Sequence, residues 1–462
     1  MKFLAILRDS LRETLDVKLF YVMVGLSLLV VLLVGSTTYR PLPVQKRIDF
    51  INNLINQSIF FQMQANPETQ QLDFRLTTED FQQLGDRPEP WLADYHFFYV
   101  FTVGTRGQED VADDKKRAAT DSIKKQIERM LKPEQLEKDL KQFFTDVKVR
   151  EAPSDNPDVI RFEVTTSKGT TAKSRQEWFH EPRLFFGLVP MPLPLFSLND
   201  IIEFIGDWVV GTGGAAFTLL ISIIMTASFL PNMLAKGSVD MLLVKPIHRT
   251  TLFIYKFLGG LLFMFLNTVL IMVGIWLGMG IQSGMWINAF LVCIFVFTFE
   301  FTMFYSVSAL VAVFTRSAIV AILAAMMAWG ALILLGWTHW GFIENQRKTA
   351  PAEYTSHWAY VGYDVVHTVM PRYKDLDWLT SKMIKEELLK PAPQQAPDPN
   401  DRAAAEAARQ RQKRLDELYE SQLKKLDKDY GSYDWKSSLA VSSLFIVLMI
   451  GLACWRFATR DY

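Results

Sequence analysis

Residues 318–337 read AIVAILAAMMAWGALILLGW, a stretch of 20 residues without a single charged side chain. The hydrocarbon core of a bilayer is about 30 Å thick, and a helix needs about 20 apolar residues to cross it. A soluble chain would instead distribute its apolar residues over amphipathic elements. This stretch therefore predicts a membrane-spanning helix, and it sets the class of the whole chain.

Five further stretches have the same character. They cover residues 19–35, 205–230, 251–280, 287–314 and 437–455. The first follows a basic N-terminus, as the apolar part of a signal peptide does, but no Ala-x-Ala cleavage pattern comes directly after it. We interpret it as a retained span. The sequence predicts an α-helical membrane protein with six spans, with residues 251–337 holding spans three to five.

Composition limits what lies outside the membrane. The chain has 462 residues, half of them hydrophobic, and its formal net charge is zero. A neutral chain gives no electrostatic reason to expect nucleic-acid binding. The two cysteines, Cys293 and Cys454, both lie inside apolar stretches. We therefore expect no disulfides in the polar regions.

Orientation follows from the basic residues near the span ends, because cytoplasmic loops carry the excess of Lys and Arg. Those residues are Lys2, Arg8, Arg12 and Lys18 before span one, Lys236, Lys245, Arg249 and Lys256 around the second loop, Arg316 after span four, and Arg456 and Arg460 after span six. With six spans they all fall on one side. Both termini are predicted to be cytoplasmic, including the tail 456–462, and residues 36–204 and 338–436 to face outward.

The predicted outer regions differ in type. Residues 36–204 have the pattern of an α+β domain, with helices at 44–63 and 113–131 and strands at 95–103, 147–150 and 159–166. The proline-rich stretch 189–195 is expected to be extended. Residues 338–436 are predicted to be mostly helical, with a charged helix at 401–428. The N-terminal residues 1–18 fit a helix in the membrane interface, or equally one packed on the protein's own core.

The loop before span three, within residues 231–250, carries the most informative motif. Residues 236–249 read KGSVDMLLVKPIHR. Ser238 is a suitable N-cap and Pro246 stops a helix, so a short amphipathic helix is expected between them. It would expose Met241, Leu242 and Leu243. Such a helix either contacts another protein or only anchors the loop in lipid.

This loop resembles that of the type-two ABC exporter permeases, in which Gly-Thr, a Leu pair, Pro, Arg and a later Lys with Gly recur in order. The matching residues are Gly237, Ser238, Leu242, Leu243, Pro246, Arg249, Lys256 and Gly259. The acidic residue that usually precedes the glycine is absent, since Ala235 and Lys236 stand there, although Asp240 is nearby. The amphipathic segment 365–379 before span six and the arginines after it also look like this family.

The resemblance implies a permease subunit, and not an enzyme, whose loop is a coupling helix seated in a separate cytoplasmic ABC ATPase. The chain itself contains no Gly-x-x-x-x-Gly-Lys-Ser/Thr phosphate loop. The family implies a dimer with itself or a similar chain, in a bacterial inner membrane, without a cofactor. The sequence leaves open two other classes of protein. One is a membrane scaffold with outer protein-binding domains, and the other is a membrane-embedded enzyme.

Several intramembrane residues are candidates for special roles. Glu300, near the middle of span four, is costly at that depth and is either functional or a neutral group bonded to a neighbouring helix. Asn267, Ser306 and Ser308 are expected to join helices, and Gly274-x-x-x-Gly278 permits a close helix contact. A metal site from His339, His357, His367 and Asp364 is disfavoured, because their spacing matches no compact metal motif.

Overall fold

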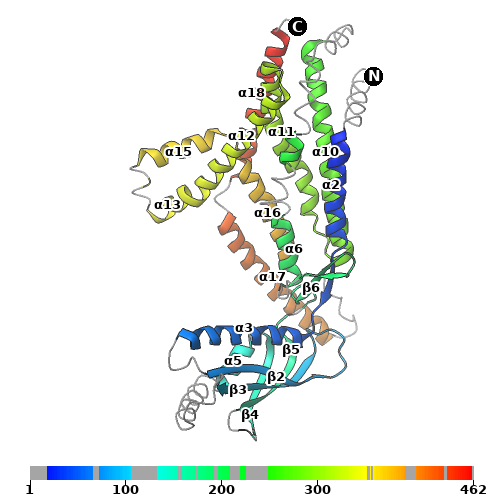
Figure 1. The fold of residues 1–462 in the computed structure, drawn as a ribbon, viewed down its shortest axis with the longest axis vertical. Coiled ribbons are helices and arrows are strands. Elements are labelled where there is room, and N and C mark those ends of the chain that lie inside the picture. Colours follow the sequence, from blue (N-terminus) through cyan, green and yellow to red (C-terminus); the bar gives the residue numbers. More distant parts are fainter. Residues whose placement is uncertain are drawn as a thin grey trace. The chain divides into compact units, whose positions relative to one another are not determined.

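The computed structural model describes residues 18–65, 72–105, 133–154, 156, 159–172, 174–191, 196–208, 219–224, 248–350, 354, 357–390, 402–430 and 434–459. The chain divides into two compact units. The sheet unit is Thr38–Ile201, and the helical unit joins Met1–Thr37 to Ile202–Tyr462. Figure 1 shows the elements of both, and each unit is described by itself.

The sheet unit is built on two antiparallel sheets. The larger has the strand order β2-β3-β5-β4, and the smaller β1-β6-β7. Its elements are β1 (Thr38–Pro41), α3 (Val44–Ala65), β2 (Leu72–Leu84), β3 (Asp94–Thr105), α5 (Pro133–Leu140), β4 (Phe144–Ala152), β5 (Val159–Thr170), β6 (His180–Leu184) and β7 (Val189–Pro190). The predicted helix 44–63 and the predicted strands 95–103, 147–150 and 159–166 are present. The predicted helix 113–131 lies outside the described residues.

The core of the sheet unit comes from the alternation of apolar residues on β3. Tyr95, Phe97, Tyr99 and Phe101 share one face of the strand and are buried, as period-two patterning requires. They pack in one cluster with side chains from α3, α5 and the neighbouring strands. Trp178 closes the cluster, and its indole N–H donates to the Leu42 carbonyl at 2.9 Å. The sequence predicts part of β3 from its content of strand-forming residues, but it does not predict the polar strand β2.

The helical unit contains the apolar stretches. Its elements are α2 (Lys18–Gly35), α6 (Leu198–Gly206, which begins in the sheet unit), α10 (Arg249–Ser283), α11 (Ala289–Thr315), α12 (Ala318–Thr338), η2 (His339–Ile343), α13 (Glu344–Thr349), α15 (Trp358–Val369), α16 (Tyr373–Leu389), α17 (Arg402–Tyr430) and α18 (Trp435–Thr459). Within the described residues, four helices are long and apolar enough to span a membrane, namely α10, α11, α12 with its continuation to Arg347, and α18. These correspond to predicted spans three to six.

The other two predicted spans are only partly described. The apolar part of α2, Tyr21–Gly35, is shorter than the four long helices. In the stretch predicted as span two, the structure describes residues 205–208 and the helical residues 219–224. The count of six spans therefore stays a prediction. The predicted interfacial helix at the N-terminus lies outside the described residues.

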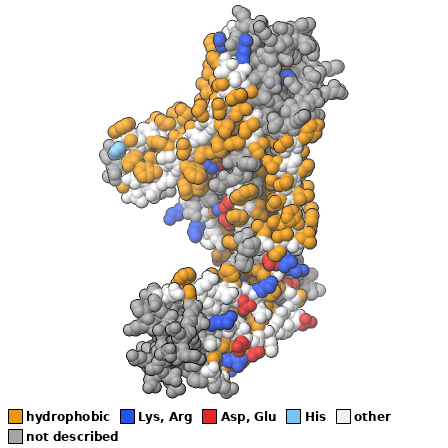
Figure 2. Space-filling model, viewed as in Figure 1, with side chains coloured by type: hydrophobic (Ala, Val, Ile, Leu, Met, Phe, Trp, Pro, Cys, Tyr) orange, Lys and Arg blue, Asp and Glu red, His pale blue; other side chains and the backbone are white. Residues whose placement is uncertain are grey.

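The centre of the helical unit is α11, which packs against α10, α12, α16 and α18. Phe301 and Tyr305 of α11 stack on each other, and Phe257 of α10 stacks on Tyr305 with ring centroids 4.7 Å apart. On the face shown in Figure 2, hydrophobic side chains cover much of the described helical unit, while charged side chains are prominent on the sheet unit. A helix surface of this composition suits a lipid environment.

Close contact between α2 and α10 depends on glycine. A Cβ at Gly278 would stand 2.7 Å from the Gly35 Cα, and one at Gly274 would collide with Val31. The Ser27 hydroxyl donates to Asn267 Oδ1 at 3.0 Å in the same interface. The prediction that Gly274-x-x-x-Gly278 and Asn267 serve helix packing is confirmed, as expected where small residues let backbones approach.

Beyond α12 the chain turns back on itself. Figure 1 shows α12 continuing through η2 into α13, and α15 returning toward the end of α12. The segment 365–379, predicted as one amphipathic stretch, is divided between two helices, since α15 ends at Val369 and α16 begins at Tyr373. Pro371 lies in the break, where it cannot continue a helix. Helix α17 contacts α16 through an ion pair, in which Lys382 Nζ of α16 lies 2.7 Å from Asp427 Oδ1 of α17.

Candidate functional site

The residues predicted to couple to an ATPase lie almost wholly outside the described part of the chain. These are Gly237, Ser238, Asp240, Met241, Leu242, Leu243 and Pro246. Arg249 is described, and it is the first residue of α10. The structure thus shows where the predicted coupling loop ends and which helix it enters. Its conformation stays a prediction.

Glu300, the predicted intramembrane residue, lies in α11 and is 0% exposed. Neither of its carboxyl oxygens has a hydrogen bond of standard geometry among the described residues. Its side chain meets Asp377 of α16. Two ionised carboxylates repel each other and neither can donate, so this contact calls for a proton on one of them. The pair is a site where the protein can hold a proton.

Asp377 is buried, and one of its oxygens is paired. Lys374 Nζ lies 2.7 Å from Asp377 Oδ2, whereas Asp377 Oδ1 receives no hydrogen bond of standard geometry from the described residues. The Tyr373 hydroxyl is also close to this carboxylate. Burial raises the pKa of Asp377, although the Lys374 ammonium opposes that shift. One ammonium therefore faces two carboxyl groups.

A neighbouring buried acid connects α16 to α18. The Ser438 hydroxyl donates to Asp375 Oδ2 at 2.5 Å. Burial raises the pKa of Asp375, and the hydrogen bond from Ser438 acts in the opposite direction. Arg372 extends the link, since its Nη1 donates to the Ser437 hydroxyl at 3.3 Å. Polar groups of α16 thus contact both α11 and α18, and a movement of one helix must disturb the others.

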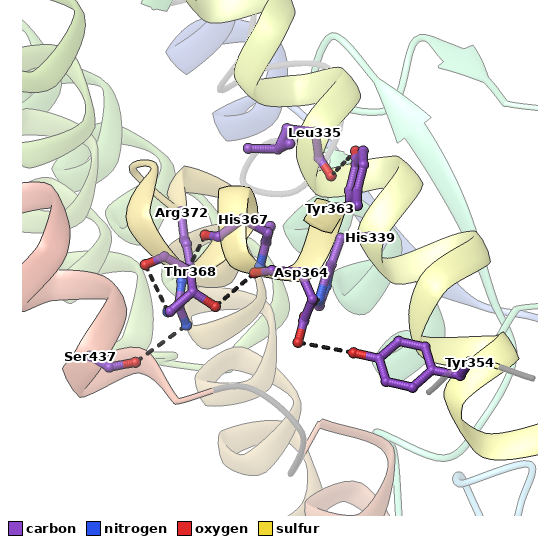
Figure 3. Close-up of polar contacts among 9 residues, drawn as sticks. All are labelled: Leu335, His339, Tyr354, Tyr363, Asp364, His367, Thr368, Arg372 and Ser437. Atoms are coloured by element: carbon purple, nitrogen blue, oxygen red, sulfur yellow. Dashed lines mark hydrogen bonds and ion pairs between the residues drawn. The ribbon is translucent and has the colours of Figure 1, made fainter. Parts of the chain in front are cut away.

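The break between α15 and α16 is stabilised by polar contacts with η2, which Figure 3 shows at close range. The rings of His339 and His367 stack, with centroids 3.7 Å apart and planes within 4° of parallel. His339 Nε2 donates to Asp364 Oδ1 at 2.9 Å, and the Tyr354 hydroxyl donates to Asp364 Oδ2 at 3.1 Å. Arg372 donates from its guanidinium to the carbonyls of His367 and Thr368.

These contacts set the charge states of the cluster. Burial lowers the pKa of His367 to about 4, so this ring is neutral near pH 7 and can stack closely on His339. For Asp364, burial raises the pKa, but the hydrogen bonds from His339 and Tyr354 outweigh burial and hold the pKa below its usual value. Asp364 is therefore an anion that orients His339.

The described residues contain no group of three or more His, Cys, Asp and Glu side chains suited to a metal ion. The structure does bring His339, His367 and Asp364 together, but His357 contacts the ring of Tyr360 instead. Asp364 is engaged by two donors. The contacts of His339, His367 and Asp364 therefore stabilise the break between α15 and α16.

A cavity of about 550 Å³ joins the two clusters. Its lining comes from the end of α12, from η2, α15 and α16, and from the residue after α6. The lining residues are Asp207, Gly336, Trp337, His339, Trp340, Gly341, His367, Lys374, Asp375, Asp377, Trp378, Ser381 and Lys385. Cavities of roughly 300–1,000 Å³ accommodate small organic molecules. Glu300 does not line the cavity, but its side chain meets that of Asp377, which does.

The sequence indicates Glu300 as a candidate, but it does not indicate its partner. Asp377 is distant in sequence and lies in a segment that seemed ordinary for an amphipathic helix. The signal available was the group of charged residues Lys374-Asp375-x-Asp377 within an amphipathic segment that lies before the last span. Ionisable side chains in such surroundings mark functional sites often enough to deserve a test.

A family model described as ABC-2 family transporter protein matches residues 4–462, nearly the whole chain. The chain belongs to the ABC-2 transporter family. This confirms the resemblance seen in the loop and its flanks, and it makes the chain a multi-pass membrane protein of the permease type. Neither the comparison with curated proteins nor that with solved structures gives a match.

Proposed function

We propose that the chain is the permease subunit of an ABC transporter and moves a substrate across a bacterial inner membrane with energy from a separate ATPase. Membership of the ABC-2 transporter family carries this proposal. The four long apolar helices support it, since a permease must provide spans. So does the absence of a phosphate-binding loop from the sequence, which leaves ATP hydrolysis to a partner.

In this proposal the loop of residues 231–250 is the coupling element. Its apolar residues Leu242 and Leu243 enter a groove of the ATPase, and closure of the ATPase dimer moves them as a rigid element. Arg249 is the first residue of α10, and this helix packs on α2 and α11. Movement of the loop would therefore pass directly into the centre of the helical unit.

The permease pairs with a second copy or a similar chain, both termini are cytoplasmic, and residues 36–204 face outward.

The test is capture of the partner by the detergent-solubilised full-length chain. Wild type should bring down an ATPase with Walker motifs, and a Leu242→Asp, Leu243→Asp double variant should lose most of it, because two charges cannot enter an apolar groove. Leu418→Asp on α17 is the matched control, since Leu418 is exposed and lies in a region predicted to face the other side. It should retain wild-type capture.

Two results would contradict the proposal. If neither wild type nor the control captures an ATPase, the loop is a lipid anchor, and a membrane scaffold becomes the better description. If the double variant captures as much as wild type, the ATPase binds elsewhere and residues 237–249 are not the coupling element.

A further inference from the structure

The cavity beside α16 has the chemistry of a binding site. Trp340 is 49% exposed, and Gly341 has open space where a Cβ would lie, so the cavity opens to the surroundings of the helices. Its inner wall is Asp377, which is nearly fully buried. An apolar entrance that leads to a buried ionisable group is the usual form of a small-molecule site.

Three tryptophans form much of the apolar lining. Trp337 and Trp340 come from α12 and η2, and Trp378 comes from α16. The ring centroids of Trp340 and Trp378 lie 4.8 Å apart, and the two ring planes are inclined by 44°. Indole faces are electron-rich, and among aromatic side chains they attract cations most strongly. The lining therefore favours an apolar molecule that carries positive charge.

The ionisable groups of the lining also favour a ligand with positive charge. The lining has three carboxyl groups, those of Asp207, Asp375 and Asp377, and two ammonium groups, those of Lys374 and Lys385. Both ammonium groups already have carboxylate partners. Lys374 pairs with Asp377 at 2.7 Å, and Lys385 lies 3.0 Å from Glu203 and 3.4 Å from Asp207. An incoming anion would find no cation in this lining that is not already engaged.

Buried oxygens without donors supply a second, independent observation. Asp377 Oδ1 and both oxygens of Glu300 accept no hydrogen bond of standard geometry from the described residues. Buried carboxyl oxygens are costly when left unpaired. Lys374 pairs with Asp377 Oδ2, and the proton that the contact between Glu300 and Asp377 calls for is the other positive charge at these oxygens. A bound cation can take the place of that proton.

We propose that this cavity binds an organic cation with an apolar body, whose charged group lies toward Asp377 and whose body rests on Trp337, Trp340 and Trp378. The described residues hold no cluster suited to a metal ion, and the tryptophan rings offer an apolar surface that only an ion with an apolar body can cover. As a binding site the cavity stands on its own. As the place where cargo enters the permease, it rests on the proposed transport function.

The experiment uses two probes of nearly equal size and opposite charge, tetraphenylphosphonium and tetraphenylborate. Radiolabelled probe is equilibrated with the full-length purified chain in detergent, without ATPase, and binding is also followed by quenching of tryptophan fluorescence. The cation should bind saturably and at least about tenfold more tightly than the anion. Equal affinity for both probes would overturn the proposal, because it would indicate apolar partitioning alone.

Variants locate the site. Asp377→Asn should weaken cation binding at least about tenfold, the effect of losing about 1.4 kcal/mol, because it removes a carboxylate and leaves Lys374 uncompensated. Trp340→Leu should weaken it at least about threefold through loss of the indole face. Trp358→Leu is the matched control, since Trp358 is 83% exposed and does not line the cavity. It should bind like wild type.

The outcomes separate folding, binding and transport. Thermal unfolding is recorded for each variant, and if Asp377→Asn does not fold, Trp340→Leu and Trp337→Leu decide the question. Unchanged cation affinity in folded Trp340→Leu and Trp337→Leu variants would refute the site. Because no ATPase is present, cation binding can succeed where ATPase capture fails, and the reverse, so the two proposals fail independently.

Discussion

Helices α11 and α12 are neighbours in sequence and both are long enough to cross a membrane, yet they occupy opposite environments in the helical unit. In the most apolar window of α11, 56% of the residues are buried, against 11% in the corresponding window of α12. The helix that contains a glutamate is central, and the one without any charge between 318 and 338 is peripheral. Hydropathy identifies both as spans, but it does not identify which of them is the core.

The difference follows from the solvent. In water, an apolar residue is driven into the core, so hydrophobicity reports burial. Lipid is as apolar as leucine and gives no such preference, so helices associate through packing, small residues and polar contacts. Helix α11 has the groups that make such contacts, including Glu300 and Ala309, both of them buried, whereas the buried Ser306 hydroxyl donates to the Met303 carbonyl of its own helix. Helix α12 buries chiefly Ala321 and Ala325.

The largest effect should come from removing a large side chain from α11 and comparing it with the same change on α12. Phe301 is 0% exposed and Leu323 is 54% exposed. We expect Phe301→Ala to lower the free energy of unfolding by about 3 kcal/mol, because the lost ring leaves a cavity. Leu323→Ala should change it little. The measurement is the unfolding midpoint of the full chain in one detergent.

A comparable loss of unfolding free energy for both variants would contradict the contrast between α11 and α12, since it would mean that α12 is buried as well. If Leu323→Ala is destabilising only at protein concentrations where the chain associates, a second copy covers α12. That result would show that α12 is peripheral in one chain but covered in the assembly, and it would support the proposed dimer.

A medium effect is expected at the contact between α2 and α10. Gly278→Ala places a Cβ 2.7 Å from the Gly35 Cα, and the helices must separate to accept it. We expect a loss of about 1–3 kcal/mol, as for other overpacked sites. Gly330→Ala on α12 is the control, because nothing lies within 4 Å of its added Cβ.

Alanine favours a helix over glycine, so Gly330→Ala should be neutral or slightly stabilising in the same thermal measurement. Equal destabilisation by the two substitutions would contradict the prediction, because helix propensity favours alanine at both positions and Gly330 has open space for a Cβ. The close approach of α2 to α10 would then not explain the loss at Gly278.

The smallest effect concerns pH at the end of α12, where this otherwise peripheral helix continues into η2 and is covered by α15. His367 has a pKa of about 4 in the folded chain, below the value of about 6.5 expected when unfolded. The unfolded chain therefore binds more protons, and stability should fall as the pH drops from about 6.5 toward 4. Thermal midpoints at pH 7.5 and 5.5 measure this loss.

The variant His367→Asn has no imidazole to protonate and should lose less stability than wild type over the same interval. His357→Asn is the control, because that ring is exposed, and it should follow wild type. If His367→Asn shows the full wild-type loss, the acid sensitivity arises elsewhere and the stacked histidines are not its source.

Sequence reasoning was strongest where the determining property is local. The bounds of α10, α11, α12 and α18 were predicted within a few residues, because apolar length is read along the chain. Strand β3 was predicted from its aromatic run. Strand β2 was missed, because LDFRLTTEDFQQL is largely polar and forms a strand by pairing with β3.

Of the candidate site, Glu300 was predicted from its depth in a span, but its partner was not. Whether Glu300 meets lipid, a hydroxyl or another acid depends on α16, a helix that joins the core only after the chain reverses at η2. The stacked histidines have the same origin. Both contacts join residues that no periodic pattern relates.

The amino-acid sequence is enough to establish that this protein lies in a membrane, that it belongs to the ABC-2 transporter family, and that it carries an ionisable residue inside an apolar stretch. Those properties reside in runs of consecutive side chains. The packing of the helices is needed to show that α11 is central, that Gly35 meets Gly278, and that Glu300 meets Asp377, which lines the cavity with the tryptophans. Within lipid, hydrophobicity no longer separates inside from outside, so only the packed arrangement of helices can assign those contacts.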